Sequence, residues 1–260
     1  LHDFFLSNIV AHLDSCGEKP NCWAQALIHA HGWAALHARY QTKDITDQVW
    51  AYPCNLEILQ QALGVIVHSE YSRQLAHKWY GPDAANKLTV IPFLRVPAIK
   101  TDRHASLRKL GFDEGEFIVC SFGMLGPIKL NHRLLTAWLS SPLANDPHCH
   151  LIFVGQNHGG DYGVELVKSI HKNHAENRIK ITGWVDTESY RAWHTASNLC
   201  VQLRVMSRGE TSGAVLDCMN YGRATVVNMH GAMAELPADA VWLLPDQFSD
   251  EQLTEALTTL

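Results

Sequence analysis

The feature that most constrains the fold is the alternation of strand and helix patterns between residues 117 and 260. Short runs of apolar residues recur there, and a helical pattern separates most of them from the next run. Strands that alternate with helices form a parallel sheet covered on both faces, so the sequence predicts a Rossmann-like α/β domain. The predicted strands are 117–121, 150–154, 178–181, 199–203, 224–227 and 241–244.

Residues 1–100 are predicted to form a separate, smaller unit. A segment with Pro92 and Pro97 loses helical periodicity before the second unit, as a linker does. We therefore expect two domains, 1–100 and 101–260. The first unit shows only two short strand patterns, too few for a full Rossmann-like sheet. The chain also begins at Leu1 rather than Met, so the N-terminal domain is expected to be incomplete.

Composition narrows the class of protein. The chain has 260 residues, a formal charge of −5 and no clustered basic stretch, which argues against nucleic-acid binding and a polybasic membrane patch. Its seven cysteines are odd in number and follow no repeating spacing, which favours reduced thiols in the cytoplasm over a disulfide scaffold. No apolar stretch approaches the roughly 20 residues of a membrane span.

The segment from Arg208 to Gly222 carries the strongest functional signal. It follows a predicted strand as a short polar loop, and a helix is expected to open at Thr211, Ser212 or Gly213. A helix N-terminus offers free N–H groups and the positive end of a dipole, which suits a phosphate. The acids Glu210 and Asp217 flank this position and are suited to sugar hydroxyls, so the segment indicates a phosphorylated sugar ligand, most plausibly a nucleotide-sugar.

A second loop, after the strand at 117–121, contains Gly123, Gly126 and Lys129. Glycine lets backbone approach a phosphate closely, and lysine supplies a positive charge. Ligands of Rossmann-like domains bind at the carboxyl ends of the strands, so this loop and the 208–222 segment are expected at one edge of the sheet. The alternative for this loop is a tight turn with a solvated lysine. The spacing also differs from the G-x-G-x-x-G dinucleotide fingerprint, which makes a dehydrogenase the least favoured function.

With these two loops and three further motifs, the chain resembles the retaining glycosyltransferases of family 4. The resemblance spans almost the whole length and is strongest from Val119 to Pro237. Five pieces carry it in order: H-D at 2–3, V-H-S-E-Y-S at 67–72, G-M-L-G-P-I-K at 123–129, F-V-G with I-T-G-W-V at 153–155 and 181–185, and the segment from Arg208 onward. It implies a GT-B fold, in which two Rossmann-like parallel-sheet domains face a cleft.

The resemblance also implies roles for individual residues. Lys129 corresponds to the lysine that neutralises the donor diphosphate, and Glu210 to the first acid of a paired-acid motif beside the donor sugar. Asp217 corresponds to the second acid, which binds ribose, and His2 to a histidine facing the transferred sugar. These are the expected catalytic residues Glu210, Lys129 and His2, together with the donor-binding residues Gly123, Gly126, Lys129, Trp184, Val185, Arg208, Glu210, Thr211, Ser212, Gly213 and Asp217.

Two departures from the family pattern concern charge and spacing. Met124 stands where the family has an arginine, and Arg208 or Arg204 is expected to supply the missing charge. Six residues rather than seven separate Glu210 from Asp217, and the second acid is an aspartate. The ribose assignment is therefore weaker than the diphosphate assignment.

Simpler interpretations apply to several of these residues. Glu210 is also suited to capping the helix through the N–H groups of Ser212 or Gly213, and Asp217 to a solvated helix face. His2, at the chain start, is equally suited to disorder or core packing. His12, Cys16, Cys22, His29 and His31 suggest zinc, but their spacing matches no usual ligand set, so metal binding is disfavoured. Trp23, Trp33 and Trp50 suit core packing better than an acceptor groove.

The sequence thus predicts a glycosyltransferase that moves a sugar from a UDP- or GDP-linked donor to a glycan or lipid-linked acceptor, without cofactor or metal. By family association the expected setting is bacterial surface polysaccharide or lipopolysaccharide synthesis, in the cytoplasm or at the inner face of the membrane, with peripheral membrane association left open. The alternatives are a non-catalytic nucleotide-sugar-binding module of GT-B type, or a nucleotide-sugar epimerase or phosphorylase.

Overall fold

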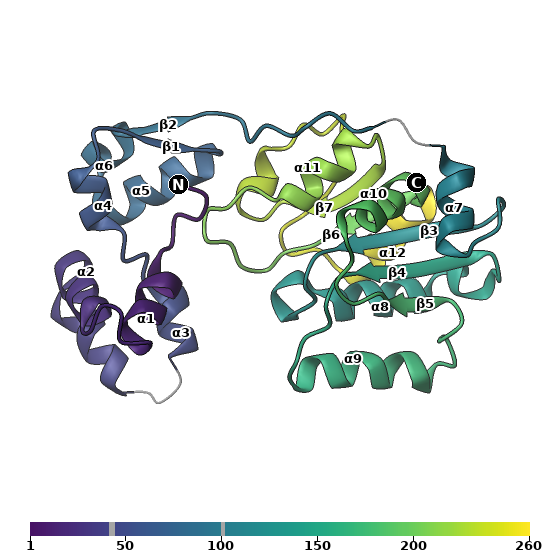
Figure 1. Cartoon of the computed structure of the whole chain (residues 1–260), viewed down its shortest axis with the longest axis horizontal. Coiled ribbons are helices and arrows are strands. Elements are labelled where there is room, and N and C mark those ends of the chain that lie inside the picture. The colour runs from purple at the N-terminus through teal and green to yellow at the C-terminus, as the bar shows by residue number, and fades with distance from the viewer. Residues whose placement is uncertain (42–44, 100–101) are drawn as a thin grey trace. The chain divides into compact units, whose positions relative to one another are not determined.

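A computed structural model describes residues 1–41, 45–99 and 102–260. By their internal contacts these residues form two compact units, one made of Leu1–Phe93 with Ser207–Thr211 and the other of Leu94–Met206 with Ser212–Leu260 (Figure 1). The domain boundary that the sequence predicts between residues 100 and 101 lies outside the described residues. A short segment remote in sequence, 207–211, thus groups with the N-terminal unit.

The C-terminal unit is built on one parallel sheet. Within the described residues this sheet has six strands in the order β5-β4-β3-β6-β7-β8. Counted from β3, the order is 3-2-1-4-5-6, that of a doubly wound Rossmann fold, and the chain reverses direction across the sheet between β3 and β6. The predicted α/β class with a parallel sheet is confirmed. The strands are β3 (Phe117–Phe122), β4 (Cys149–Val154), β5 (Ile179–Ile181), β6 (Leu199–Gln202), β7 (Ala224–Asn228) and β8 (Trp242–Leu244).

Helices follow the strands as the periodicity predicts. The helix expected to open at Thr211, Ser212 or Gly213 is α11, which begins at Gly213. The sequence missed α7, which begins at the end of the expected linker. Asp102 caps this helix, and Gly111 ends it in a left-handed conformation. The helices are α7 (Arg103–Leu110), α8 (Asn131–Ser140), α9 (Asp161–Lys172), α10 (Thr187–Ala196), α11 (Gly213–Asn220) and α12 (Asp250–Thr259), with short 3₁₀ turns at Pro127–Lys129, Pro142–Asn145 and Gly231–Glu235.

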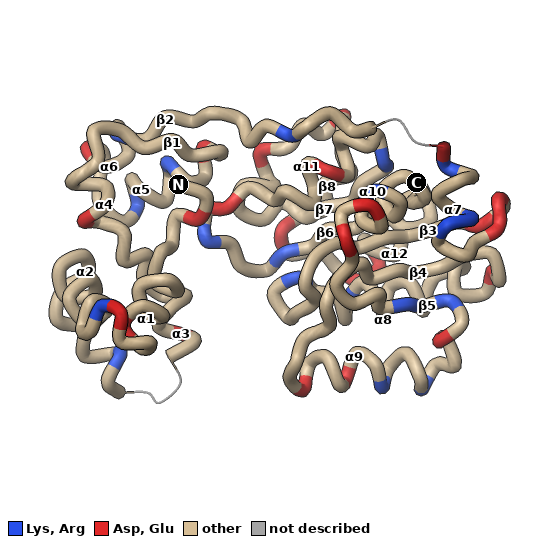
Figure 2. Tube along the Cα trace, in the orientation of Figure 1, with Lys and Arg blue, Asp and Glu red and all other residues tan. Residues whose placement is uncertain are grey.

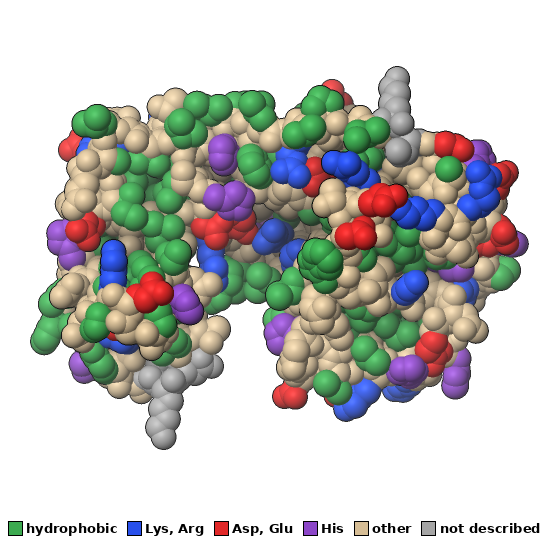
Figure 3. Space-filling model, in the orientation of Figure 1, with side chains coloured by type: hydrophobic (Ala, Val, Ile, Leu, Met, Phe, Trp, Pro, Cys, Tyr) green, Lys and Arg blue, Asp and Glu red, His purple; other side chains and the backbone are tan. Residues whose placement is uncertain are grey.

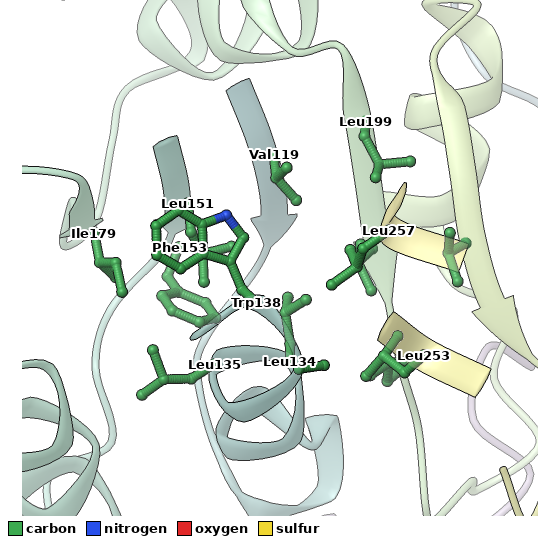
Figure 4. Close-up of a cluster of buried hydrophobic side chains, with 14 of the residues drawn as sticks. Val119, Leu134, Leu135, Trp138, Leu151, Phe153, Ile179, Leu199, Leu253 and Leu257 are labelled. Atoms are coloured by element: carbon green, nitrogen blue, oxygen red, sulfur yellow. The ribbon is translucent and has the colours of Figure 1, made fainter. Parts of the chain in front are cut away.

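Two apolar layers sandwich this sheet because successive side chains of a strand point to opposite faces. Val119 points to one layer, where Trp138 of α8 lies among side chains of the sheet and of α12 (Figure 4). Ile118 and Cys120 point to the other layer, which contains Trp193 of α10. Trp138 is fully buried, so its replacement by alanine would cost about 3–5 kcal/mol.

The N-terminal unit is mostly helical. Within the described residues its sheet has two parallel strands, β1 (Val65–Val67) and β2 (Leu88–Val90), paired in register from Val65 and Leu88. Ser69 caps the helix that follows β1 by accepting from the backbone N–H of Ser72. The helices are α1 (Ser7–Ser15), α2 (Cys22–Gln41), α3 (Thr46–Ala51), α4 (Leu56–Gln61), α5 (Glu70–Tyr80) and α6 (Pro82–Asn86).

Charged residues of both signs are interspersed along each unit. Lysines and arginines alternate with acids along the trace, and the face in Figure 3 shows no broad basic area (Figures 2 and 3). Among the described residues, no helix has the length and apolar character needed to cross a membrane. The arrangement of charge gives no support for a nucleic-acid interface on this face.

Candidate functional site

The predicted phosphate loop lies at the point where the Rossmann sheet reverses direction. It follows β3, and the chain that leads to α11 follows β6, the neighbouring strand on the other side of the reversal. The two segments also meet, because the backbone N–H of Val205 donates to the carbonyl of Ile128 at 3.0 Å. Ligands of doubly wound folds bind in the crevice at this reversal, outside the carboxyl ends of the strands. The structure therefore brings the loop after β3 to the place where an anionic ligand is expected.

Gly123 and Lys129 are in direct contact within this loop. Gly123 has a φ of 102°, a conformation that only glycine adopts readily, and a Cβ there would overlap the Lys129 ammonium. Lys129 Nζ donates to the carbonyl of Phe122, the last residue of β3, at 3.2 Å. Gly155 packs so closely behind the loop that a Cβ on it would overlap the Gly123 carbonyl. The lysine charge is thus held at the carboxyl end of β3 by two glycines.

Gly126, a predicted donor-binding residue, shows no steric need for glycine. Its backbone is extended, and a Cβ would lie at an ordinary 3.8 Å from the His158 ring. Its N–H already donates to Asn131 Oδ1 at 3.0 Å. Met124, which stands where the family has an arginine, is exposed. The turn is therefore held by Asn131, which the sequence did not single out.

The helix expected to open between residues 211 and 213 begins at Gly213. Ser212 is its N-cap, and the Ser212 hydroxyl accepts from the N–H of Val215 at 3.4 Å. The alternative in which Glu210 caps this helix is wrong, because Ser212 has that position. Gly222 follows the helix with a φ of 62°, as expected of a residue just past a helix end. The N-terminus of α11 belongs to the C-terminal unit, with Lys129.

Asp217 faces inward from α11, so the alternative of a solvated helix face is wrong. Its carboxylate accepts from Arg95 Nε at 2.8 Å and from Arg95 Nη2 at 2.6 Å. The Tyr190 hydroxyl donates to the same carboxylate at 3.1 Å. Burial, with the nearby charge of Asp217, raises the pKa of Tyr190. A ribose at this position would have to share a carboxylate that already has two protein partners.

Trp184 and Val185 lie in the loop between β5 and α10. Trp184 is exposed, whereas Val185 packs against the apolar layer that contains Trp193. Asp186 follows them and caps α10 by accepting from the N–H of Ser189 at 2.7 Å. Trp184 therefore presents an uncovered aromatic surface at this sheet edge, which a planar base can stack on.

The segment Ser207–Thr211 is anchored in the N-terminal unit. The Arg208 carbonyl accepts from the N–H of Phe4 at 2.6 Å, and the Gly209 carbonyl accepts from the Ser72 hydroxyl at 2.6 Å. Gly209 has a φ of 88°, and a Cβ there would meet Phe4 Cβ at 2.7 Å. The Thr211 hydroxyl donates to the carbonyl of His68 at 3.3 Å. The loop thus has a fixed conformation within this unit.

Glu210 and Arg208 have defined contacts within that segment. Glu210 Oε2 accepts from the N–H of Arg208 at 2.6 Å and from the Ser207 hydroxyl at 3.1 Å. The Arg208 guanidinium lies 3.8 Å over the centre of the Trp50 ring, and its Nε is buried with no hydrogen-bond partner among the described residues. The Arg208 charge is thus held in place by the face of the Trp50 ring.

His2 and Arg208 line one cavity of the N-terminal unit. The cavity has a volume of about 550 Å³ and is also lined by Asp3 and His12. His2 Nδ1 lies 2.6 Å from Asp3 Oδ1. An imidazole paired with a carboxylate can hold or pass a proton beside a bound hydroxyl. The structure thereby brings together two predicted site residues from distant parts of the chain.

The predicted site residues therefore form two groups. Lys129, Gly123, Gly126, Trp184, Val185, Ser212, Gly213 and Asp217 belong to the C-terminal unit, and His2, Arg208, Glu210 and Thr211 to the N-terminal unit. Sequence reasoning missed Arg95 and Tyr190. Arg95 is a lone arginine between two prolines, which carries no periodic or motif signal.

The histidines and cysteines considered for zinc at 12–31 do not assemble. Among the described residues, these side chains form no group of three or more with converging ligand atoms. Trp23 is core, as expected, while Trp33 is exposed and Trp50 lines a second cavity, of about 300 Å³, with Arg208. Two of the three tryptophans, Trp33 and Trp50, are therefore not the core residues that the sequence favoured.

The structure is similar to solved structures of glycosyltransferases and of a sucrose-phosphate synthase. HepE of Anabaena, in complex with UDP-glucose, aligns with a TM-score of 0.66 and 23% identity over 79% of this chain and 56% of that one. WaaG, a glycosyltransferase involved in lipopolysaccharide biosynthesis, gives 0.62 and 17% over 85% and 61%. The synthase, from Thermosynechococcus elongatus, gives 0.61 and 20% over 85% and 55%. The predicted fold is confirmed as a partial GT-B match, and the chain spans a little over half the length of these proteins.

Sequence comparison places the chain in a family. No curated protein sequence matches it. The family described as "Glycosyl transferases group 1", however, matches residues 102–260, which include the loop after β3, the β5–α10 loop and α11. This match covers more than half of the chain and agrees with the resemblance that the motifs indicated. The chain therefore belongs to the group 1 family of glycosyl transferases.

Proposed function

We propose that this protein is a retaining glycosyltransferase, which moves a sugar from a nucleotide-sugar donor to a glycan or lipid-linked acceptor. One observation carries the proposal. The Gly123–Lys129 contact holds a lysine charge at the carboxyl end of β3, where the Rossmann sheet reverses and where α11 begins after the neighbouring strand. A cation and a helix N-terminus that follow neighbouring strands at one sheet edge are suited to the charge of a diphosphate.

The chemistry follows from the charge that develops on the leaving group. When the bond between the sugar and the diphosphate breaks, negative charge grows on the departing phosphate oxygen. Lys129 and the N–H groups at the start of α11 would stabilise that charge. Retention of configuration requires the acceptor hydroxyl to attack on the face that the diphosphate leaves. Its proton passes to the departing phosphate, so the products are the glycosylated acceptor and a nucleoside diphosphate.

The remaining site residues are assigned to the sugar and the base. We infer that Glu210 and His2 contact the transferred sugar, that Arg208 adds positive charge for the diphosphate, and that Trp184 stacks on the nucleobase. The structures of HepE were determined with UDP and UDP-glucose, so UDP-sugars are the first donors to test. WaaG is a glycosyltransferase involved in lipopolysaccharide biosynthesis, and this likeness supports a proposed role in lipopolysaccharide or polysaccharide synthesis.

The test is donor binding followed by turnover. Calorimetry with UDP, GDP and a panel of their sugars should give a complex with one of the two bases. Lys129→Met should weaken that binding by about tenfold to a hundredfold, because a charge-assisted contact to phosphate is lost. Lys168→Met is the matched control, since Lys168 is exposed on α9 of the same unit, where its ammonium pairs with Glu165. Equal affinities for both variants would refute the assignment.

A non-catalytic nucleotide-sugar-binding module is the second candidate. It is favoured by one observation: within the described residues the N-terminal unit has a sheet of only two strands. Such a module would bind the donor with the same dependence on Lys129 but release no nucleoside diphosphate with any acceptor. Interconversion of donor sugars without an acceptor would instead indicate an epimerase.

A further inference from the structure

His194 is an unusual histidine in the core of the C-terminal unit. It lies on α10 with no exposed surface, and neither of its ring nitrogens has a hydrogen-bond partner among the described residues. Leaving a buried polar atom unpaired costs about 1–3 kcal/mol, so native structures rarely leave both nitrogens of one ring in this state. The ring therefore requires an explanation.

Thiols surround this ring. The Sγ atoms of Cys200 on β6 and Cys218 on α11 and a ring nitrogen of His194 all lie within 4.8 Å of one another. Cys120 on β3 pairs in register with Cys200, so the two side chains point to the same face of the sheet. All three cysteines are fully buried in the apolar layer against α10. One imidazole and two thiols thus converge, and a third thiol, that of Cys120, lies on the same sheet face beside Cys200.

The spacing is close to that of a tetrahedral zinc site. With zinc–sulfur bonds of about 2.3 Å and zinc–nitrogen bonds of about 2.0 Å, ligand atoms lie about 3.5–3.8 Å apart. The three ligand atoms, which lie within 4.8 Å of one another, would have to move together by up to about 1 Å as the ion binds. Two aromatic rings stack on the imidazole, with ring centroids 3.8 Å away for Phe122 and 5.1 Å away for Tyr221. This stacking fixes the orientation of the His194 ring.

We propose that His194, Cys200, Cys218 and Cys120 form a zinc site inside the sheet–helix core of the C-terminal unit. Three thiolates and one imidazole are a common ligand set of structural zinc. The ion would join α10 and α11 to β3 and β6. It would therefore fix the helix whose N-terminus faces the proposed donor site, while remaining separate from the metal-independent chemistry proposed there.

Protonation and charge are compatible with such a site. Burial lowers the pKa of His194 to about 3, with Arg223 and Arg95 adding to the effect, so the imidazole is a neutral ligand near pH 7. Burial raises the pKa of the Cys120 and Cys218 thiols, so zinc must displace their protons as it binds.

A supporting residue lies beside one ligand. Ser197 Oγ is 3.5 Å from Cys200 Sγ and 3.0 Å from the carbonyl of His194, and the residue is fully buried. Its hydroxyl can turn to donate to a Cys200 thiolate, as groups around zinc ligands commonly do. The Ser197 side chain thus contacts both the Cys200 thiol and the backbone of His194.

The first experiment uses the unmodified full chain without a histidine tag. It is expressed with added zinc, purified with a non-thiol reductant, desalted and measured for metal content and zinc X-ray absorption. We expect about one zinc per chain, with about three sulfurs at 2.3 Å and one nitrogen at 2.0 Å. Fewer than about one zinc in ten chains, or a shell of only nitrogen and oxygen from surface histidines, would overturn the proposal.

Variants then assign the ligands. Cys218→Ala should lower the zinc content at least tenfold, whereas Cys149→Ala should retain it. Cys149 is the matched control, because it is buried in β4 of the same unit but belongs to the opposite apolar layer. If Cys218→Ala does not fold, cobalt replacement in the unmodified chain decides: thiolate-to-cobalt charge-transfer bands support the site. Their absence refutes it, as would equal zinc loss in a folded Cys149→Ala variant.

Discussion

Arg95 and Asp217 form a two-pronged ion pair in the C-terminal unit, 122 positions apart in the sequence. Arg95 Nε lies 2.8 Å from one carboxylate oxygen, and Arg95 Nη2 lies 2.6 Å from the other. Tyr190 adds a third hydrogen bond to the same carboxylate. The pair fixes α11, which follows the loop with the site residues, to a segment that the sequence indicated only as a linker. Asp217 therefore has a structural function whether or not it also binds ribose.

Replacing Arg95 should destabilise the C-terminal unit. In Arg95→Met the mostly buried carboxylate of Asp217 loses its cation, so we expect the free energy of unfolding to fall by about 2–4 kcal/mol. Urea denaturation followed by circular dichroism measures this change. The double variant Arg95→Met/Asp217→Asn should recover part of the loss, because it no longer buries an unpaired charge. Additive losses would show that the two residues do not interact.

The contact between Gly123 and Lys129 predicts a position-specific effect of adding one methyl group. Gly123→Ala places a Cβ on the lysine ammonium and strains a φ of 102°. We expect a stability loss of about 1–3 kcal/mol and at least tenfold weaker nucleotide binding. Gly159→Ala is the control at the same sheet edge, because a Cβ on Gly159 would have no atom within 4 Å and its φ is not in the left-handed region. Thermal unfolding and calorimetry compare the two; equal effects would contradict the proposed geometry.

Glu210 provides a test that separates catalysis from folding. Glu210→Gln keeps an oxygen that accepts from the Arg208 N–H, so the 207–211 loop should retain its conformation. If Glu210 acts on the donor, turnover should fall by about a hundredfold or more with a melting temperature within about 2 °C of the parent. Glu165→Gln on the exposed surface of α9 is the control. Full turnover of Glu210→Gln would exclude a catalytic role for its charge.

His31 should make the N-terminal unit sensitive to acid. Burial lowers the pKa of His31 to about 4, and its Nε2 accepts from the N–H of Cys54 at 3.3 Å. Below pH 6.5 the unfolded chain takes up a proton that the folded chain rejects. Stability therefore falls as the pH drops from 6.5 towards 4, by about 1 kcal/mol between pH 7 and pH 5 after allowing for partial exposure. His31→Gln should reduce this loss relative to the parent in thermal unfolding at both pH values. An unchanged pH profile would contradict it.

The strands of the C-terminal unit could be predicted because their signal is local. Each of the six predicted runs overlaps a strand of the sheet, since buried parallel strands are continuous apolar runs. The start of α11 was also predictable, because Ser212 and Gly213 are good residues for a helix N-terminus. The helix α7 was missed because its residues are mostly polar and prolines precede it, as in a linker. Its N-cap, Asp102, was the signal that could have revealed it.

The sequence predicts which residues belong to the candidate site, but not the contacts that they make. A motif places Lys129 in a loop after β3, but only the folded backbone shows that it lies on Gly123. The same is true of Arg208 on Trp50, and of the carboxylate that Asp217 shares with Arg95 and Tyr190. Most of these pairs are far apart in the sequence, and no periodicity connects them.

The sequence by itself determined the parallel α/β architecture, the family and the loops at the carboxyl edge of the sheet, because strand runs, helix caps and glycine-rich turns depend on neighbouring residues. The tertiary structure alone decided that residues 207–211 group with the N-terminal unit, and that His194, Cys200 and Cys218 converge in the core. Contacts of this kind depend on the order of the strands in the sheet and on the register in which they pair. Strand order arises from packing over long sequence separations, which local residue preferences do not encode.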